Sequence, residues 1–336
     1  MRKFRVKHGL GGLGAELTTK QGLMEFSRIN QKMQLNEIKE IIDKLDSCET
    51  WSVNMLKFKS TEREGYSCFA REIKFRSNQE LMNYISSIKD NYIGKNHLLE
   101  KFIEIREYDG STEGDVIYEL DLNSELVKDS YEKIIHALLH ADQEIDPFSK
   151  KYDGYVLSGN LMGKEIHLFK IHSPFVNLEN RYILDNSYFS KIKGPILSLM
   201  LTVDVMIYGE KIFLFKISVE NLFNMEKAYK AKSDICINEI IDSGIVEGIE
   251  LFQKFASSGQ NPRRFIKYDA SHLEELKNED VRKRIGVKFS IPMKEGKYII
   301  ENEDSVDKLI KVLCKRGMLD PFDDAPMEVS GSKNWS

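Results

Sequence analysis

The stretch from residue 203 to residue 217 constrains the fold most, because it reads as two strands closed by a tight turn. Apolar and other side chains alternate with period two over residues 203–208, which is typical of a half-buried strand. Gly209 and Glu210 form a two-residue turn with glycine first, as a type II′ hairpin requires. Residues 212–217 are apolar on both sides. This second strand is therefore predicted to lie near the centre of a sheet and to be covered on both faces.

The rest of the chain predicts an α+β fold. Strands are expected at residues 51–55 and 69–75, and a strand pair at residues 98–107 and 116–122. Ser77 and Glu80 have the spacing of a capping box and open a helix. No alternation of strand and helix requires a parallel sheet. We therefore expect mixed or antiparallel sheets built from hairpins with packed helices, arranged in an N-terminal and a C-terminal part.

The polar segment 142–153 predicts the boundary between these parts. We expect an N-terminal α+β domain at residues 1–150, which begins with a flexible basic arm, and a C-terminal α+β domain at residues 151–336. The words GKEIHLFKI (163–171) and GEKIFLFKI (209–217) match closely and predict two hairpins of one design. Duplication and convergence both explain this match, and short apolar strands converge readily.

The C-terminal part predicts a run of helices. Residues 234–255 are expected to form one helix, with a kink or a close packing contact at Gly244 and Gly248. Residues 263–268 are expected to be extended, which would place the side chains of Phe265 and Arg264 on opposite sides. A helix at residues 271–285 and a strand at residues 287–291 are expected to follow.

The cysteines and the short apolar runs predict a protein of the cytoplasm. Its 336 residues carry a net charge of −4 and four cysteines that are far apart, without the spacing of a metal site. Free thiols of this kind fit a reducing compartment. The longest central apolar run, residues 195–203, is much shorter than the roughly 20 residues that span a membrane. We expect a chain that does not cross a membrane itself.

Three motifs of the sequence are candidates for reactive sites. Gly9, Gly11 and Gly14 satisfy GxGxxG, but the preceding alternation of charged and apolar residues is a poor buried strand, so this segment is expected to be an arm. His136 and His140 have the spacing of zinc ligands, but Ala137 stands where a zinc protease needs glutamate. Asp204 could serve a metal nuclease, yet no acidic-x-lysine pair faces it, so Asp204 is expected to be an outward or capping carboxylate. The sequence thus predicts no catalytic residue, no metal ligand and no cofactor.

Local positive charge is the most informative chemical feature. Residues 262–299 hold ten basic and six acidic side chains. Such a cluster is expected to hold nucleic acid phosphates without reading base sequence, since no recognition-helix motif accompanies it. The alternative is a structural role, because cations near a helix end suit its dipole. The candidate DNA-binding residues are Arg263, Arg264, Lys267, Arg282, Lys283, Arg284 and Lys288.

The second half of the chain also resembles a known family. The sequence carries VDVMIY (203–208), RFIKYD (264–269), KRIGVKFSI (283–291), KLIKVLCKRGMLDPF (308–322) and SGSKNW (330–335). These segments resemble the KwaB-like family, the cytosolic component of the Kiwa antiphage defence system. The resemblance brings no catalytic signature.

The resemblance implies an antiviral effector that binds phage DNA without sequence preference and blocks replication and late transcription. It also implies a homodimer and a multi-pass membrane partner of the same system, a KwaA-like protein, which recruits the cytoplasmic chain to the inner membrane. Two alternatives stay open: a metal-dependent nuclease that acts on the same DNA, and a scaffold that does not bind DNA.

Overall fold

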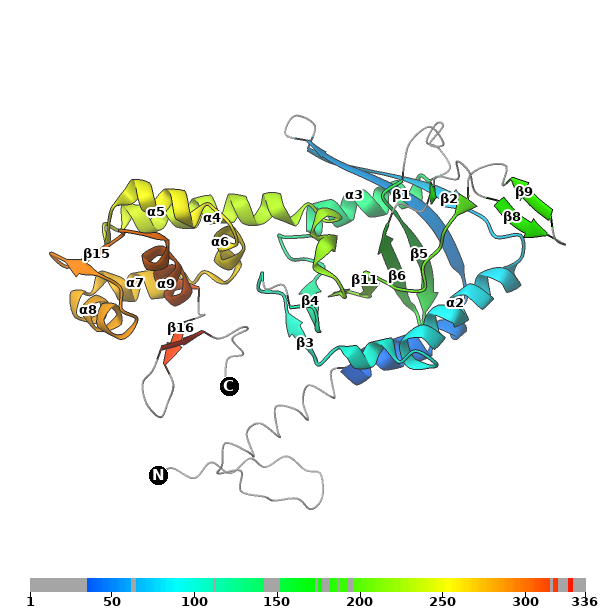
Figure 1. The fold of residues 1–336 in the computed structure, drawn as a ribbon, viewed down its shortest axis with the longest axis horizontal. Coiled ribbons are helices and arrows are strands. Elements are labelled where there is room, and N and C mark those ends of the chain that lie inside the picture. Colours follow the sequence, from blue (N-terminus) through cyan, green and yellow to red (C-terminus); the bar gives the residue numbers. More distant parts are fainter. Residues whose placement is uncertain are drawn as a thin grey trace, which may run out of the picture.

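An eight-stranded sheet forms the centre of the computed structural model (Figure 1). The structure describes residues 35–61, 65–110, 113–141, 152–172, 175–176, 182–185, 188–191, 196–314, 317–319 and 326–328. The strand order is β2-β1-β5-β6-β11-β12-β4-β3, and all neighbours are antiparallel except β3 and β4. The strands are β1 (Trp51–Thr61), β2 (Gly65–Ile73), β3 (Glu104–Glu107), β4 (Val116–Asp121), β5 (Gly154–Leu161), β6 (Lys164–Ile171), β11 (Val205–Tyr208) and β12 (Lys211–Leu214).

The hairpin of β11 and β12 is confirmed. Gly209 has a φ of +59°, a value that suits glycine in this turn. β11 lies between β6 and β12, well inside the sheet. The interpretation of its first strand as half-buried was wrong, because Val205, Met206 and Ile207 are all at most 1% exposed. Both faces of the hairpin are therefore covered.

Helices cover the two faces of this sheet. On one face lie helical residues 35–43, α2 (Asn78–Ile93) and the 3₁₀ helices η1 (Leu45–Ser47) and η2 (Leu98–Lys101). On the other lie α3 (Lys128–Leu139), η4 (Ile217–Asn221) and the start of α4 (Met225–Asp242). The hydroxyl of Ser77 accepts the Glu80 N–H at 3.2 Å, which confirms the predicted start of α2. The predicted α+β class is correct.

The predicted boundary near residue 150 falls inside the sheet. β1 pairs with β5 over residues that lie on opposite sides of this position, from Trp51↔Gly159 to Leu56↔Gly154. The strand pair predicted at residues 98–122 also differs, since β3 and β4 are parallel and residues 98–101 form η2. We call the sheet with its covering helices the sheet unit.

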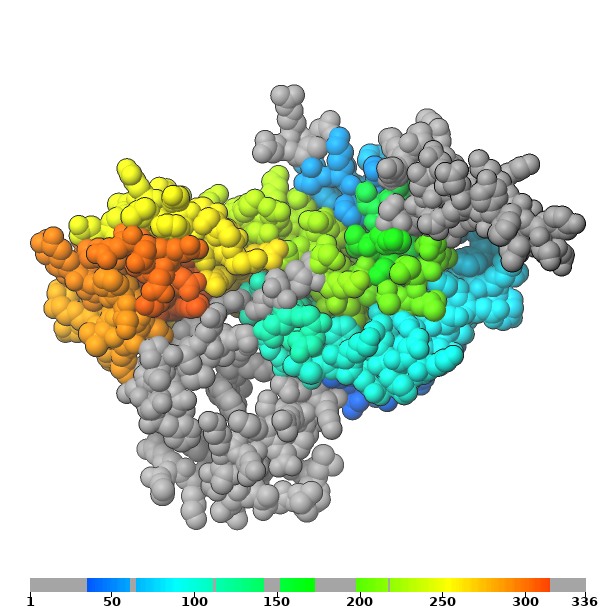
Figure 2. Space-filling model, viewed as in Figure 1, coloured from blue at the N-terminus to red at the C-terminus, as the bar shows by residue number. Residues whose placement is uncertain are grey.

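The remaining helices form a second core, which we call the helical unit (Figures 1 and 2). α4 runs from the sheet unit into it, and Cys236, Ile237 and Ile240 near the end of α4 belong to this core. Its other elements are β13 (Val246–Glu247), α5 (Ile249–Ala256), α6 (Asn261–Arg264), η5 (Phe265–Lys267), α7 (Ala270–Lys277), α8 (Glu279–Lys288), β14 (Met293–Lys294), β15 (Lys297–Ile299) and α9 (Glu303–Leu313).

Three predicted elements differ in this region. The helix expected at residues 234–255 is two helices, because Gly244 and Gly248 both adopt positive φ and turn the chain between α4 and α5. Residues 271–285 likewise divide at Asn278, whose side chain caps α8. Residues 287–288, expected in a strand, end α8 instead.

Short strand pairs complete the described residues. They are β7 (Phe175–Val176) with β10 (Ile196–Leu197), β8 (Tyr182–Asp185) with β9 (Tyr188–Lys191), and β16 (Gly317–Leu319) with β17 (Pro326–Glu328). No helix within the described part of the chain combines the length and the apolar character needed to span a bilayer.

Candidate nucleic-acid interface

The segment that carries Arg263, Arg264 and Lys267 is helical, not extended as predicted. Pro262 stands in the first turn of α6, where its missing N–H costs nothing and its fixed φ favours a helix. Asn261 anchors this turn, because its amide donates to the Phe255 carbonyl at 3.0 Å. Phe265 follows and is fully buried. The apolar side chain of Phe265 thus packs in the core, while the three cationic side chains point in other directions.

Arg263 joins the helical unit to the sheet unit. Its Nη2 lies 2.5 Å from Glu220 Oε2, and the two side chains are 20% and 6% exposed. The hydroxyl of Tyr108 donates to the other oxygen of Glu220, so both carboxylate oxygens are occupied. The guanidinium also lies 5.6 Å from the centre of the Tyr229 ring. The charged group of Arg263 is therefore paired within a buried cluster of side chains.

The backbone at this junction is packed tightly. Gly110 has a φ of +82°, and a Cβ built on it would lie 2.6 Å from the Arg263 carbonyl oxygen. Only glycine satisfies both the conformation and the approach. The contact fixes the position of α6 against the loop that follows β3.

Arg264 and Lys267 are paired with carboxylates as well. Arg264 Nη1 pairs with Asp307 of α9 and donates to Asn261 Oδ1 at 2.9 Å. Lys267 Nζ lies 2.8 Å from Glu107 Oε1 at the end of β3. All three predicted cations of this segment thus hold neighbouring elements in place.

The pKa values of the partner carboxyls reflect these contacts. Burial raises the pKa of Glu220, and the Tyr108 hydrogen bond and the Arg263 charge only partly offset this effect. Burial also raises the pKa of Asp307, but hydrogen bonds from Lys311 and Arg264 outweigh this effect and leave the pKa below its usual value. Of these two carboxyls, only Glu220 therefore has a pKa above its usual value.

Arg282 has a structural role in the helical unit. Its Nη1 donates to the Leu276 carbonyl at 2.6 Å, and its Nε donates to the Gly296 carbonyl. These bonds join the end of α7, the start of α8 and the turn between β14 and β15. Arg282 is the fourth predicted residue whose donors serve the fold.

The other predicted cations lie on α8, at the end of the helical unit that is farther from the sheet (Figure 1). Lys283 and Arg284 are exposed, and Lys288 is half-buried. Arg284 has no hydrogen bond or ion pair with any described residue. Lys283 pairs with Glu279 one turn earlier at 2.7 Å, with both side chains more than half exposed. Solvent screens an exposed pair of this kind, so a phosphate can compete for Lys283.

Two further cations lie close to this helix and were not singled out from the sequence. Lys294 and Lys297 are exposed on β14 and β15. That hairpin packs against α8, because a Cβ on Gly286 would lie 2.4 Å from the Met293 sulfur. We call Lys283, Arg284, Lys288, Lys294 and Lys297 the α8 surface. Their membership of the basic window 262–299 was the available signal.

The other candidate reactive residues of the sequence lie away from the α8 surface or outside the described residues. Asp204, expected to be outward or capping, is 1% exposed and lies 2.8 Å from Lys170 Nζ. His136 on α3 stacks on His140, the C-cap residue of that helix, with ring centres 4.2 Å apart. Among the described residues, no three His, Cys, Asp or Glu side chains are grouped so that they could hold a metal ion. The basic arm with its GxGxxG word and the SGSKNW ending lie outside the described residues.

The fold and this site define a class: an α+β protein whose two-sided mixed sheet carries a separate helical unit with a cationic helix at its end. The chain belongs to the family described as "Kiwa protein KwaB-like", whose model matches residues 149–317. This range includes β5 and every element from there to α9, and it confirms the resemblance. Membership implies a role in Kiwa antiphage defence. Comparison with curated proteins and with solved structures finds no match.

Proposed function

We propose that this chain is a DNA-binding effector of a Kiwa antiphage system and that the α8 surface holds the DNA. Family membership supports the defence role. The exposed position of Lys283 and Arg284 supports phosphate binding, because neither charge is buried or strongly paired. The observation that carries the proposal is Arg284, an exposed arginine without a partner in the described part of the chain.

The proposed contact is electrostatic and independent of base sequence. Each lysine or arginine that neutralises a phosphate releases counterions, so affinity falls steeply with salt. Bound protein obstructs polymerases on phage DNA and thereby blocks replication and late transcription. Arg263, Arg264, Lys267 and Arg282 support this surface by holding the helical unit in place, and they do not contact DNA themselves.

Partner proteins follow from membership of the Kiwa system. We propose that one of them is the KwaA-like multi-pass membrane protein and that it recruits the chain to the inner membrane. We also propose that the chain acts as a homodimer. Co-purification with the membrane partner and light scattering of the pure chain test these two statements separately.

A gel shift with plasmid DNA tests the central proposal. The wild type is compared with Lys283→Glu/Arg284→Glu, and with Lys128→Glu/Lys133→Glu as a control that changes the net charge equally on the exposed side of α3. We expect the α8 variant to lose retention that the control keeps. Equal retention by all three proteins contradicts the surface. Adding Mg²⁺ or Mn²⁺ separates the alternatives, since nicked DNA would indicate a nuclease and absence of any shift would indicate a scaffold.

A further inference from the structure

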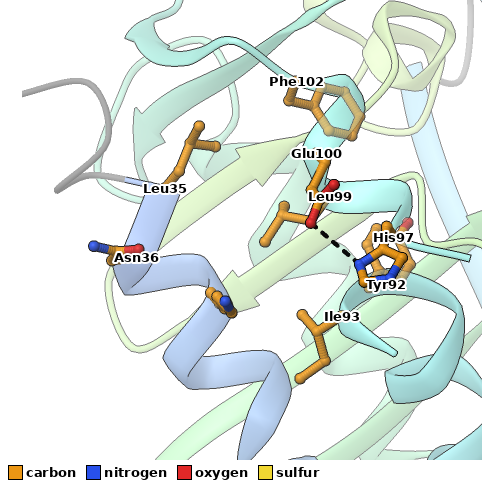
Figure 3. Close-up of a pocket in the computed structure, with 9 residues that line it drawn as sticks. Leu35, Asn36, Tyr92, Ile93, His97, Leu99, Glu100 and Phe102 are labelled. Atoms are coloured by element: carbon orange, nitrogen blue, oxygen red, sulfur yellow. Dashed lines mark ion pairs between the residues drawn. The ribbon is translucent and has the colours of Figure 1, made fainter. Parts of the chain in front are cut away.

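A cavity lies in the sheet unit, between helical residues 35–43 and the corner where α2 meets η2 (Figure 3). Its volume is about 320 Å³, at the small end of the range for small-ligand sites. The cavity is built from elements that do not belong to the α8 surface. It therefore raises a question separate from DNA binding.

The walls of this cavity are apolar. They are formed by Leu35, Tyr92, Ile93, Leu99 and Phe102. The Tyr92 hydroxyl already donates to the Val203 carbonyl at 3.0 Å and accepts the Val203 N–H at 2.8 Å. Tyr92 therefore offers its ring and no free hydrogen-bonding group. Two aromatic side chains and three aliphatic ones favour a flat apolar body.

The rim of the cavity is charged. His97 Nδ1 lies 3.1 Å from Glu100 Oε1, and Figure 3 shows the two side chains joined across the rim. His97 has a φ of +46°, a backbone conformation that residues other than glycine rarely adopt. Residues in such conformations cluster at binding sites. Lys39 also lines the cavity, is exposed, and has no ion pair with any residue that the structure describes. Lys39 is thus the lining cation without an ion pair among the described residues, while the Glu100 carboxylate is bonded to His97.

We propose that this cavity binds a small amphipathic anion. Its flat apolar body lies against Tyr92 and Phe102, and its carboxylate, phosphate or sulfonate group pairs with Lys39. The apolar walls exclude a ligand that is polar throughout, because burying unpaired polar groups is costly. Because Glu100 is already bonded to His97, Lys39 is the lining side chain that can pair with the acidic group of the ligand.

Titration of the full chain with the aromatic sulfonate 8-anilinonaphthalene-1-sulfonate tests this site. We expect fluorescence with one tight site per chain. Lys39→Glu should raise the Kd at least about fivefold, because one charge pair at about 4 Å is worth about that factor even in water. Lys44→Glu, an exposed reversal close by that does not line the cavity, should leave the Kd unchanged.

A second variant tests the cavity itself. Ile93→Trp should fill it and abolish the tight site, while the circular dichroism spectrum stays that of the wild type. Equal Kd values for the wild type, Lys39→Glu and Lys44→Glu would overturn the proposal even if Ile93→Trp fails to fold. Several equivalent weak sites, or no binding, would overturn it as well. DNA binding plays no part in these outcomes.

Discussion

Replacing Arg263 with methionine should destabilise the fold and leave the α8 surface intact. Methionine keeps an apolar stem against Tyr229 but removes the partner of Glu220, whose side chain is 6% exposed. Removing one partner of a fully buried ion pair costs about 3–5 kcal/mol. Arg263 is 20% exposed and Tyr108 still donates to Glu220. We therefore expect a loss of about 2–3 kcal/mol in the free energy of unfolding at pH 7.5.

This loss should depend on pH. Burial raises the folded-state pKa of Glu220 above its unfolded value, and removing Arg263 takes away an influence that lowers it. A carboxyl with a raised folded pKa favours folding when it is protonated, so stability returns as the pH falls through that pKa. The difference between wild type and Arg263→Met should therefore be smaller at pH 5 than at pH 7.5.

Urea unfolding at the two pH values measures the effect. Lys227→Met is the matched control, because Lys227 is exposed on α4 and has no ion pair within the described residues. It should change the free energy by less than about 0.5 kcal/mol. A double-mutant cycle with Glu220→Gln should give a coupling energy of about 1–3 kcal/mol. A loss at Arg263 no larger than at Lys227, or equal at both pH values, would refute the structural role.

Two further predictions concern single positions. Gly110→Ala should lower the thermal unfolding temperature more than Gly65→Ala does. Both glycines have positive φ, but only at Gly110 does the new Cβ meet the Arg263 carbonyl. Equal decreases for the two variants would contradict the close contact. Burial lowers the folded-state pKa of His167, with Glu165 acting the other way. Neutral His167 therefore contributes to the free energy of unfolding above pH 6.5, and this contribution is lost as the pH falls. His167→Gln should thus make the decline in stability between pH 6.5 and 5 less steep. An unchanged slope would show that His167 does not titrate in this way.

Much of the fold could be predicted from local pattern. Period-two alternation and Gly209 gave the central hairpin, and the spacing of Ser77 and Glu80 gave the start of α2. Pairing between distant strands has no local signal, so the β1–β5 pairing across residue 150 was missed. The parallel pairing of β3 and β4 was missed for a related reason, since a short connection between strands favours a hairpin.

The candidate site was predictable as a region and not as a set of contacts. Basic residues at 262–299 were evident, but the partners of those residues lie far away in the sequence. Glu220 lies 43 residues before Arg263, and Glu107 pairs with Lys267 from the edge of the sheet. Pro262 and Asn261 gave a local signal for a helical turn that the alternation at residues 263–267 obscured. Charge density alone therefore cannot separate a binding cation from a structural one.

The salt dependence of DNA affinity tests the central claim most directly. Fluorescence anisotropy with a random-sequence duplex gives the slope of log K against log salt, which is about 0.9 for each phosphate contacted. Lys283→Gln/Arg284→Gln should make this slope shallower by about 2, while the control Lys128→Gln/Lys133→Gln should keep the wild-type slope. Equal slopes for all three proteins would contradict the claim that the α8 surface holds the phosphates.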